Sequence, residues 1–238
     1  MRILLLIFLC GALRASSAQG FQDPAFLGAV GGTNASANPF THPTNIANLR
    51  LLWDWRTMST NFAVVSEWTN SILGILSTNK LANGAATNTP LGVYFKGSDR
   101  LSNIESIATN CSVWIVFKPM SVASGYHMVV GNAAGDSGFF MNGTTLGFYT
   151  SGPGLQAIST SIASGTEYDM LWAHGSTWLN GAAASTTATI PATIPIQSVG
   201  NDSFAEAFTG YIKFIGVWTN KTLTATDAAN LNTWSKSR

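Results

Sequence analysis

Short apolar runs separated by turn-forming residues recur along most of the chain. Several runs are apolar on both faces, which places them in the centre of a sheet rather than at its edge. Such spacing is typical of a β-sandwich or jelly roll. We therefore expect strands at residues 49–55, 92–95, 112–117, 126–130, 139–141, 146–149, 168–173, 177–179 and 211–218.

The run at residues 113–117, VWIVF, is apolar at every position, which predicts a central strand buried on both faces. Asn180-Gly181 lies between two short strand patterns and supplies the two positive-φ residues of a type I′ hairpin turn. A second tight turn is expected at residues 174–176. These signals predict strands joined by tight turns.

The last element differs from the rest. Thr224 can cap a helix, and Asp227 stands at the N3 position of a capping box, followed by Ala228, Ala229 and Leu231. We expect one short C-terminal helix after the strand at 211–218, closing an otherwise all-β domain.

The N-terminus has the order of a secretory signal peptide over residues 1–18: a basic residue, an apolar run at 3–9, then small residues ending at Ala18. Residues 19–45 are rich in Gly, Ala, Asn, Pro and Thr and predict an extended leader, with the folded domain at 46–238. After cleavage no segment reaches the roughly 18 to 20 apolar residues of a membrane span. We expect a secreted or surface-associated protein without an integral membrane segment.

Charge and cysteine content narrow the partners. The chain has 12 basic and 11 acidic residues, and loss of Arg2 and Arg14 with the signal peptide leaves 10 against 11. A nearly neutral protein has no field that attracts polyanions, so we expect no nucleic acid partner. Cys111 becomes the one cysteine of the mature form, which excludes an intrachain disulfide and favours a buried, inert thiol.

Five segments in a fixed order resemble a known superfamily. They lie at residues 45–55, 64–70, 92–101, 178–181 and 208–227. Together they resemble bacterial and phage domains of the laminin-G-like, concanavalin A-like lectin/glucanase superfamily, although Lys96 stands where that family usually has the Asp of a Phe-Asp-Gly turn. The resemblance implies an all-β, concanavalin-like jelly-roll β-sandwich. This fold serves sugar binders, hydrolases and structural modules.

Sugar binders of this kind use exposed aromatic rings that stack on the faces of sugars. Four of the eight tryptophans lie within apolar strands and are expected in the core, namely Trp53, Trp114, Trp172 and Trp218. Four aromatic residues closer to turns are the ligand-binding candidates, namely Trp68, Tyr126, Tyr149 and Trp178.

A glycoside hydrolase is an alternative, because Glu167 and Asp169 would share one face of a strand, as paired carboxylates of a retaining enzyme must. The hydrolase branch continues with a further Glu, and Met170 and Leu171 stand there instead. The other interpretation is a structural strand that turns Tyr168, Met170 and Trp172 to the core. The three histidines are scattered, which favours neither a hydrolase triad nor a zinc site.

Calcium is a candidate cofactor, because it needs only oxygen ligands. Two loops are rich in oxygen donors, one with Asn132 and Asp136 and one with Asn201 and Asp202. Both also have the composition of ordinary turns.

The first hypothesis is a secreted, non-catalytic carbohydrate-binding or adhesion module whose partner is a glycan or a surface protein. The second is a structural component of a cell surface or virion with a lectin-like fold. The third is the hydrolase that uses Glu167 and Asp169.

Overall fold

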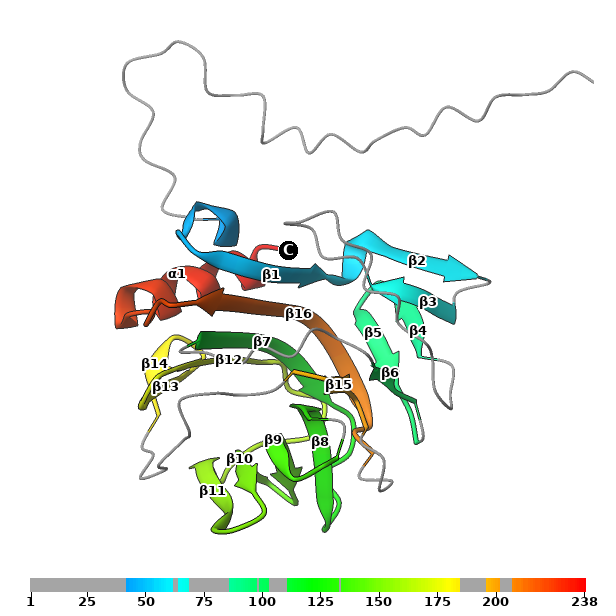
Figure 1. Ribbon diagram of the computed structural model, residues 1–238. Helices are drawn as coiled ribbons and strands as arrows, with labels where there is room; N and C mark the ends of the chain where they lie inside the picture. The colour runs from blue at the N-terminus through cyan, green and yellow to red at the C-terminus, as the bar shows by residue number, and fades with distance from the viewer. Residues whose placement is uncertain are drawn as a thin grey trace, which may run out of the picture. The chain divides into compact units, whose positions relative to one another are not determined.

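The computed structural model describes residues 42–61, 64–68, 86–97, 99–102, 111–132, 134–184, 196–201 and 207–238. The expected signal peptide and residues 19–41 of the expected leader lie outside these ranges. Short 3-10 helices occupy Pro43–Asn45 and Trp55–Thr57. The strands, shown with the helix in Figure 1, are β1 (Leu49–Asp54), β2 (Met58–Asn61), β3 (Val64–Trp68), β4 (Thr87–Thr89), β5 (Gly92–Phe95), β6 (Leu101–Ser102), β7 (Cys111–Pro119), β8 (Tyr126–Gly131), β9 (Ser137–Asn142), β10 (Thr145–Thr150), β11 (Gly154–Ser159), β12 (Tyr168–Ala173), β13 (Ser176–Leu179), β14 (Ala182–Ala183), β15 (Ser198–Val199) and β16 (Gly210–Thr219); the helix is α1 (Ala225–Lys236).

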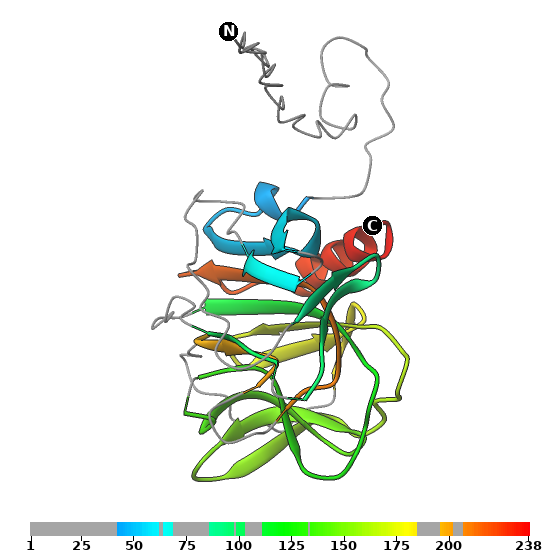
Figure 2. The same ribbon diagram turned by 90° about the vertical axis from the view of Figure 1, so that its right-hand side faces the viewer.

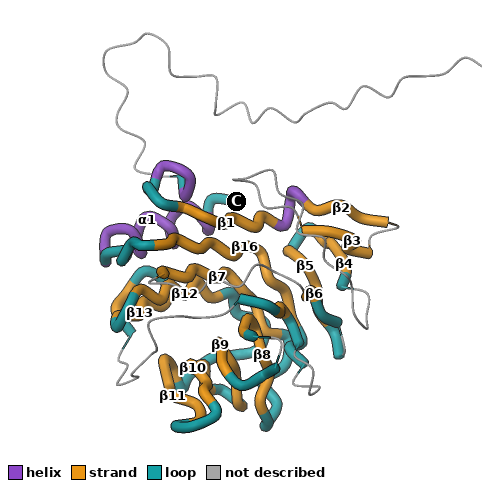
Figure 3. The backbone as a smooth tube through the Cα atoms, in the orientation of Figure 1, coloured by secondary structure: helices purple, strands orange, loops and turns teal. Residues whose placement is uncertain are grey.

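In the described ranges these strands form two antiparallel sheets. One has ten strands in the order β14-β13-β12-β7-β16-β5-β4-β3-β2, with β1 paired to β16, and the other has six in the order β11-β10-β9-β8-β15-β6. Figures 1 and 3 show β8 to β11 as one layer beneath the layer of β7, β12 and β16. The predicted β-sandwich with one short C-terminal helix is confirmed.

Strand β7 holds the centre of the large sheet, between β12 and β16. Val113, Ile115 and Phe117 point into the core between the two sheets. Trp114 and Val116 point to the opposite face, where α1 covers them. The all-apolar run therefore reflects burial on both faces, as predicted.

In the six-stranded sheet, alternate side chains of β9 and β10 point into the core between the two sheets. Phe139 of β9 and Phe148 of β10 point into it, with ring centroids 5.3 Å apart. Since successive side chains of a strand point to opposite faces, Phe140 and Tyr149 face outward. This outward face carries the candidate site.

The two predicted tight turns are present. Asn180 and Gly181 have φ angles of 53° and 78°, the double positive φ that a type I′ turn requires. His174 and Gly175, with φ angles of 22° and 88°, join β12 to β13. The turn residues thus set the register of three neighbouring strands, which includes Leu171 opposite Trp178.

Helix α1 lies on the outer side of the large sheet, as Figure 2 shows in red. The Oγ1 atom of Thr224 accepts a hydrogen bond from the Asp227 amide, and the Asp227 carboxylate accepts one from the Thr224 amide, so the predicted capping box is present. Trp234 packs on Trp114 and Phe214, with ring centroids 5.8 Å and 4.9 Å away. No helix among the described residues is long and apolar enough to cross a membrane.

At the start of the described chain, Pro43 is buried and His42 packs edge-on against Trp234, with ring centroids 5.0 Å apart. The last residues of the segment expected as a leader therefore contact the domain. Cys111 is buried, as expected.

Candidate functional site

Tyr126 and Tyr149, two of the four aromatic ligand candidates, come together on the outer face of the six-stranded sheet. Tyr126 begins β8 and Tyr149 lies in β10, and the two strands flank β9. Their ring centroids lie 4.9 Å apart with the planes tilted by 53°. We call Tyr126, Tyr149 and the phenylalanine between them, Phe140, the tyrosine face.

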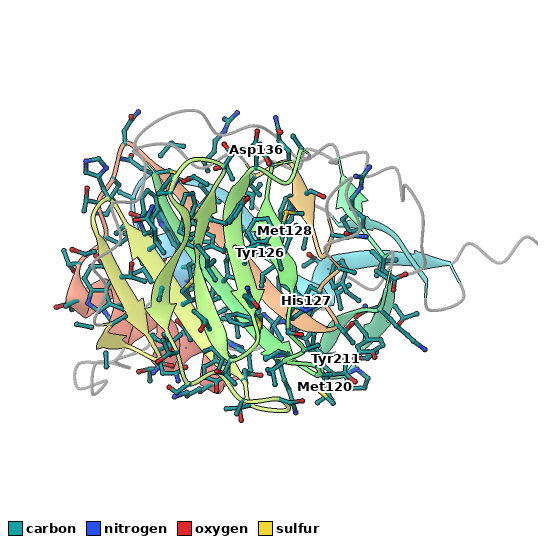
Figure 4. All side chains as sticks on the ribbon, turned by 90° about the horizontal axis from the view of Figure 1, so that it is seen from below. Met120, Tyr126, His127, Met128, Asp136 and Tyr211 are labelled. Carbon is teal, nitrogen blue, oxygen red and sulfur yellow. The ribbon has the colours of Figure 1, made fainter. Side chains whose placement is uncertain are left out.

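Phe140 supports both tyrosines from β9. Its ring centroid lies 6.4 Å from that of Tyr126 and 5.2 Å from that of Tyr149. Phe140 is fully buried, whereas both tyrosines are half-buried. The buried ring therefore fixes two partly exposed rings, and Figure 4 shows Tyr126 near the middle of this face.

Two glycines lie in the row of the sheet that contains Tyr149. Gly138 lies opposite Tyr149 in the β9–β10 pair and opposite Gly131 in the β8–β9 pair. A Cβ atom on Gly138 would lie 2.5 Å from the Gly131 Cα atom and from the Val130 carbonyl oxygen, which is closer than packing allows. Glycine at both positions therefore lets the β8 and β9 backbones approach closely in the row next to Tyr149, and both glycines are buried.

Polar side chains flank the other end of the face. Asn142 lies opposite Tyr126 on β8 and opposite Thr145 on β10, so the three share one row. The Asn142 Oδ1 atom accepts a hydrogen bond of 3.1 Å from the Gly125 amide, which orients the side-chain amide. Aromatic rings beside oriented polar groups can stack on a sugar ring and hydrogen-bond its hydroxyls.

Trp178 and Trp68 do not join this cluster. Trp178 of β13 is half-buried and packs against the apolar cluster beneath α1, on the outer face of the other sheet. Trp68 ends β3 opposite Met58, and its side chain lies outside the described part of the structure. The sequence analysis did not identify Phe140. The available signal was that Phe139 and Phe140 are neighbours in one strand and must point to opposite faces of the sheet.

The first oxygen-rich loop is a closed turn between β8 and β9. The Asn132 Oδ1 atom accepts hydrogen bonds from the amides of Asp136 and Ser137, at 3.1 Å and 3.3 Å. The Asn132 side-chain amide also donates to the Asp136 carboxylate. These contacts use the Asn132 oxygen within the turn, and the described residues include no group of three or more His, Cys, Asp or Glu side chains placed to hold a metal.

In the second loop, the Asn201 carbonyl accepts a hydrogen bond from the Ser198 hydroxyl, and Asn201 is buried. Asp202 lies outside the described residues. The calcium expectation stays a prediction.

Asp169 lies buried under the C-terminal helix. It is 4% exposed. The Trp114 Nε1 atom donates to its Oδ1 atom at 2.9 Å, and the Ser235 hydroxyl of α1 lies 2.8 Å from its Oδ2 atom. Burial raises the pKa of Asp169 to about 7, against the opposing effect of these two hydrogen bonds and of Lys236.

Glu167 lies just before β12, on the same face as Asp169, as its spacing predicts. Its Oε2 atom lies 2.6 Å from the Lys213 Nζ atom, in a salt bridge that is partly exposed. Tyr168, Met170 and Trp172 point into the core between the sheets, which matches the structural interpretation of this strand. The two carboxylates thus have different surroundings, one in solvent reach and one beneath the helix.

Comparison with known proteins gives a fold and no family. No family model matches the chain, and no curated protein matches it. Among solved structures it is similar to the Trypanosoma rangeli sialidase, with 14% identity, a TM-score of 0.61, and coverage of 81% of this chain and 33% of that one. It is also similar to domain 4 of AbnA, a GH43 extracellular arabinanase from Geobacillus stearothermophilus, with 15% identity, a TM-score of 0.53, and coverage of 78% of this chain and 98% of that domain.

The chain spans about a third of the sialidase but nearly the whole of the arabinanase domain. At these identities the likeness shows a shared β-sandwich fold. The laminin-G-like, concanavalin-like assignment stays a prediction from the sequence.

Proposed function

We propose that this chain is a secreted, non-catalytic carbohydrate-binding module whose glycan stacks on the tyrosine face. The observation that carries the proposal is the pair of half-buried rings, Tyr126 and Tyr149, packed on buried Phe140 on the outer face of the six-stranded sheet. Partly exposed rings are the groups on which the apolar face of a sugar stacks.

The arrangement suits binding because the rings are positioned before a ligand arrives. Packing against Phe140 limits the rotamers of both tyrosines, so little side-chain entropy is lost on binding. Domain 4 of the arabinanase, which has this fold, was solved in complex with arabinotriose. A neutral oligosaccharide is therefore the first ligand to test.

The non-catalytic part of the proposal rests on Asp169. A general acid must reach the glycosidic oxygen of its substrate. Asp169 is 4% exposed and hydrogen-bonded to Trp114 and Ser235 beneath α1, so a glycan on the sheet surface lies out of its reach. Burial of the carboxyl group is the largest cause of its raised pKa.

Isothermal titration calorimetry with arabinotriose and a panel of neutral oligosaccharides, with and without calcium, tests the proposal. Loss of one stacking ring removes about 1 kcal/mol of binding free energy, so Tyr149→Ala should weaken binding about fivefold. Tyr149→Phe keeps the ring and should bind nearly as well as the wild type. Leu91→Ala removes a side chain that is 48% exposed, in the turn between β4 and β5 of the other sheet, and is the matched control.

Circular dichroism melts establish that each variant is folded. Unchanged affinity in both Tyr149→Ala and Tyr126→Ala would remove the tyrosine face from the proposal. Product release from a polysaccharide panel, if Asp169→Asn abolished it, would establish the hydrolase instead.

A further inference from the structure

A second aromatic pair lies on the outer face of the ten-stranded sheet. Tyr94 of β5 and Tyr211 of β16 are opposite each other in the sheet, with ring centroids 4.9 Å apart and planes tilted by 44°. Both are half-buried. Neighbouring Val93 and Ile212 point into the core between the sheets, which turns the two tyrosines outward.

Helix α1 leaves this pair uncovered. The apolar cluster beneath the helix includes Phe214 and Trp218, in the later part of β16, and neither tyrosine belongs to it. Figure 1 shows α1 beside the end of β16, while β5 pairs with the start of the strand. The outer face of the sheet thus has one part packed under the helix and a separate, half-buried aromatic part.

Basic side chains adjoin the open pair. Lys118 of β7 lies opposite Tyr211, so the two share one row of the sheet. Lys213 follows on the same strand as Tyr211, and its Nζ atom is fixed 2.6 Å from the Glu167 Oε2 atom. Within the described part of the chain Lys118 forms no ion pair with a carboxylate, so its charge is available to a ligand.

An exposed apolar side chain borders the same surface. Met120 follows β7, is 43% exposed, and hydrogen-bonds through its amide to the Thr209 carbonyl at 2.9 Å. Figure 4 shows Met120 and Tyr211 next to each other at one edge of the molecule. An exposed apolar group beside two open rings and a lysine side chain is typical of a binding surface.

We propose that this surface, formed by Tyr94, Tyr211, Lys118, Lys213 and Glu167, is a second glycan site that selects acidic sugars. The rings stack on the sugar, the Lys118 ammonium pairs with its carboxylate, and the fixed Lys213–Glu167 pair donates to and accepts from its hydroxyls. The inference rests on the proposed function, since it takes the chain to be a glycan binder.

Charge decides between a neutral and an acidic occupant. The surface carries two lysines against one glutamate, in a chain whose formal net charge is only +1. The favourable potential is therefore local, and it suits a single carboxylate better than a polyanion. The tyrosine face shows no such lysines in its rows, where Asn142 and Thr145 stand.

Calorimetry on the full chain with a uronic acid trisaccharide and its carboxyl-reduced, neutral counterpart tests the site. Lys118→Gln should weaken binding of the acidic trisaccharide about fivefold and reduce its salt dependence, while neutral binding stays unchanged. Tyr211→Ala should weaken acidic binding to a similar degree. Lys221→Gln, a lysine in the segment before α1, is the charge-matched control and should change neither.

The outcomes separate this inference from the proposed function. If Tyr149→Ala weakens binding of both ligands while Lys118→Gln and Tyr211→Ala have no effect, the second site is wrong and the tyrosine face stands. If neither trisaccharide nor any neutral oligosaccharide binds, both proposals fail. Equal competition by a short poly-glutamate peptide would overturn the sugar assignment in favour of an acidic peptide.

Discussion

Replacement of Asp169 by asparagine tests the packing of α1 on the sheet. The native carboxyl has a pKa of about 7, because burial disfavours its charged form, whereas the unfolded chain has the ordinary value of 3.8. Between these values the native state holds a proton that the unfolded state has released. The free energy of unfolding must therefore fall as pH rises from about 4 to about 7, and level off above that.

The hydrogen bonds fit a protonated side chain. The Ser235 hydroxyl lies 2.8 Å from the Asp169 Oδ2 atom and 3.0 Å from the Asn232 carbonyl oxygen, and its one hydrogen cannot serve both. If Oδ2 carries the proton, it donates to Ser235, which then donates to Asn232. The Trp114 indole still donates to Oδ1. Asparagine, neutral and of the same shape, can make the same contacts.

Each pKa unit corresponds to about 1.4 kcal/mol, so the wild type should lose about 4 kcal/mol across the whole window, and about 2 kcal/mol of it between pH 5 and pH 7. Asp169→Asn lacks this proton. Relative to the wild type, the variant should gain about 2 kcal/mol in stability between those two pH values.

Urea denaturation followed by tryptophan fluorescence measures both proteins at about pH 5 and about pH 7.5. Asp136→Asn, which removes an exposed carboxylate from the β8–β9 turn, is the control for the change in net charge. If wild type and Asp169→Asn lose stability in parallel over this range, Asp169 is ionised in the native state and its burial beneath α1 is wrong. The same variant serves the hydrolase test, so one protein answers both questions.

Three further predictions concern stability and reactivity. Thr224→Ala removes the cap of α1 and should lower the free energy of unfolding by about 1 kcal/mol in the same urea assay. Gly181→Ala should cost about 1 to 2 kcal/mol, because φ is +78° and the new Cβ would lie 3.1 Å from the Asn232 Nδ2 atom; a variant as stable as the wild type would contradict the positive φ of this turn. Cys111, 1% exposed, should react with a thiol reagent only after denaturation, and rapid labelling of the folded protein would show that β7 is accessible.

Much of the fold was predictable because it depends on local chemistry. β5 and β12 have the predicted bounds, and the Asn180-Gly181 turn and the Thr224 cap follow from conformational preferences that act within a few residues. β11 was not predicted, since its sequence, GLQAIS, has little alternation, and its pairing with β10 supplies what its composition lacks. The short strands β4, β6 and β15 likewise depend on their partners.

For the candidate sites, the sequence by itself determined which aromatic residues lie near turns. It also determined that Glu167 and Asp169 share one face of a strand, because successive side chains of a strand point to opposite faces. Only the tertiary structure decided what those faces meet. Register across β9 brings Tyr126 to Tyr149, pairing of β16 with β5 brings Tyr211 to Tyr94, and α1 covers Asp169 while leaving Glu167 partly exposed. Contacts between strands far apart in the chain carry no local signal, so the assembled sheets alone determine which surfaces are available to a ligand.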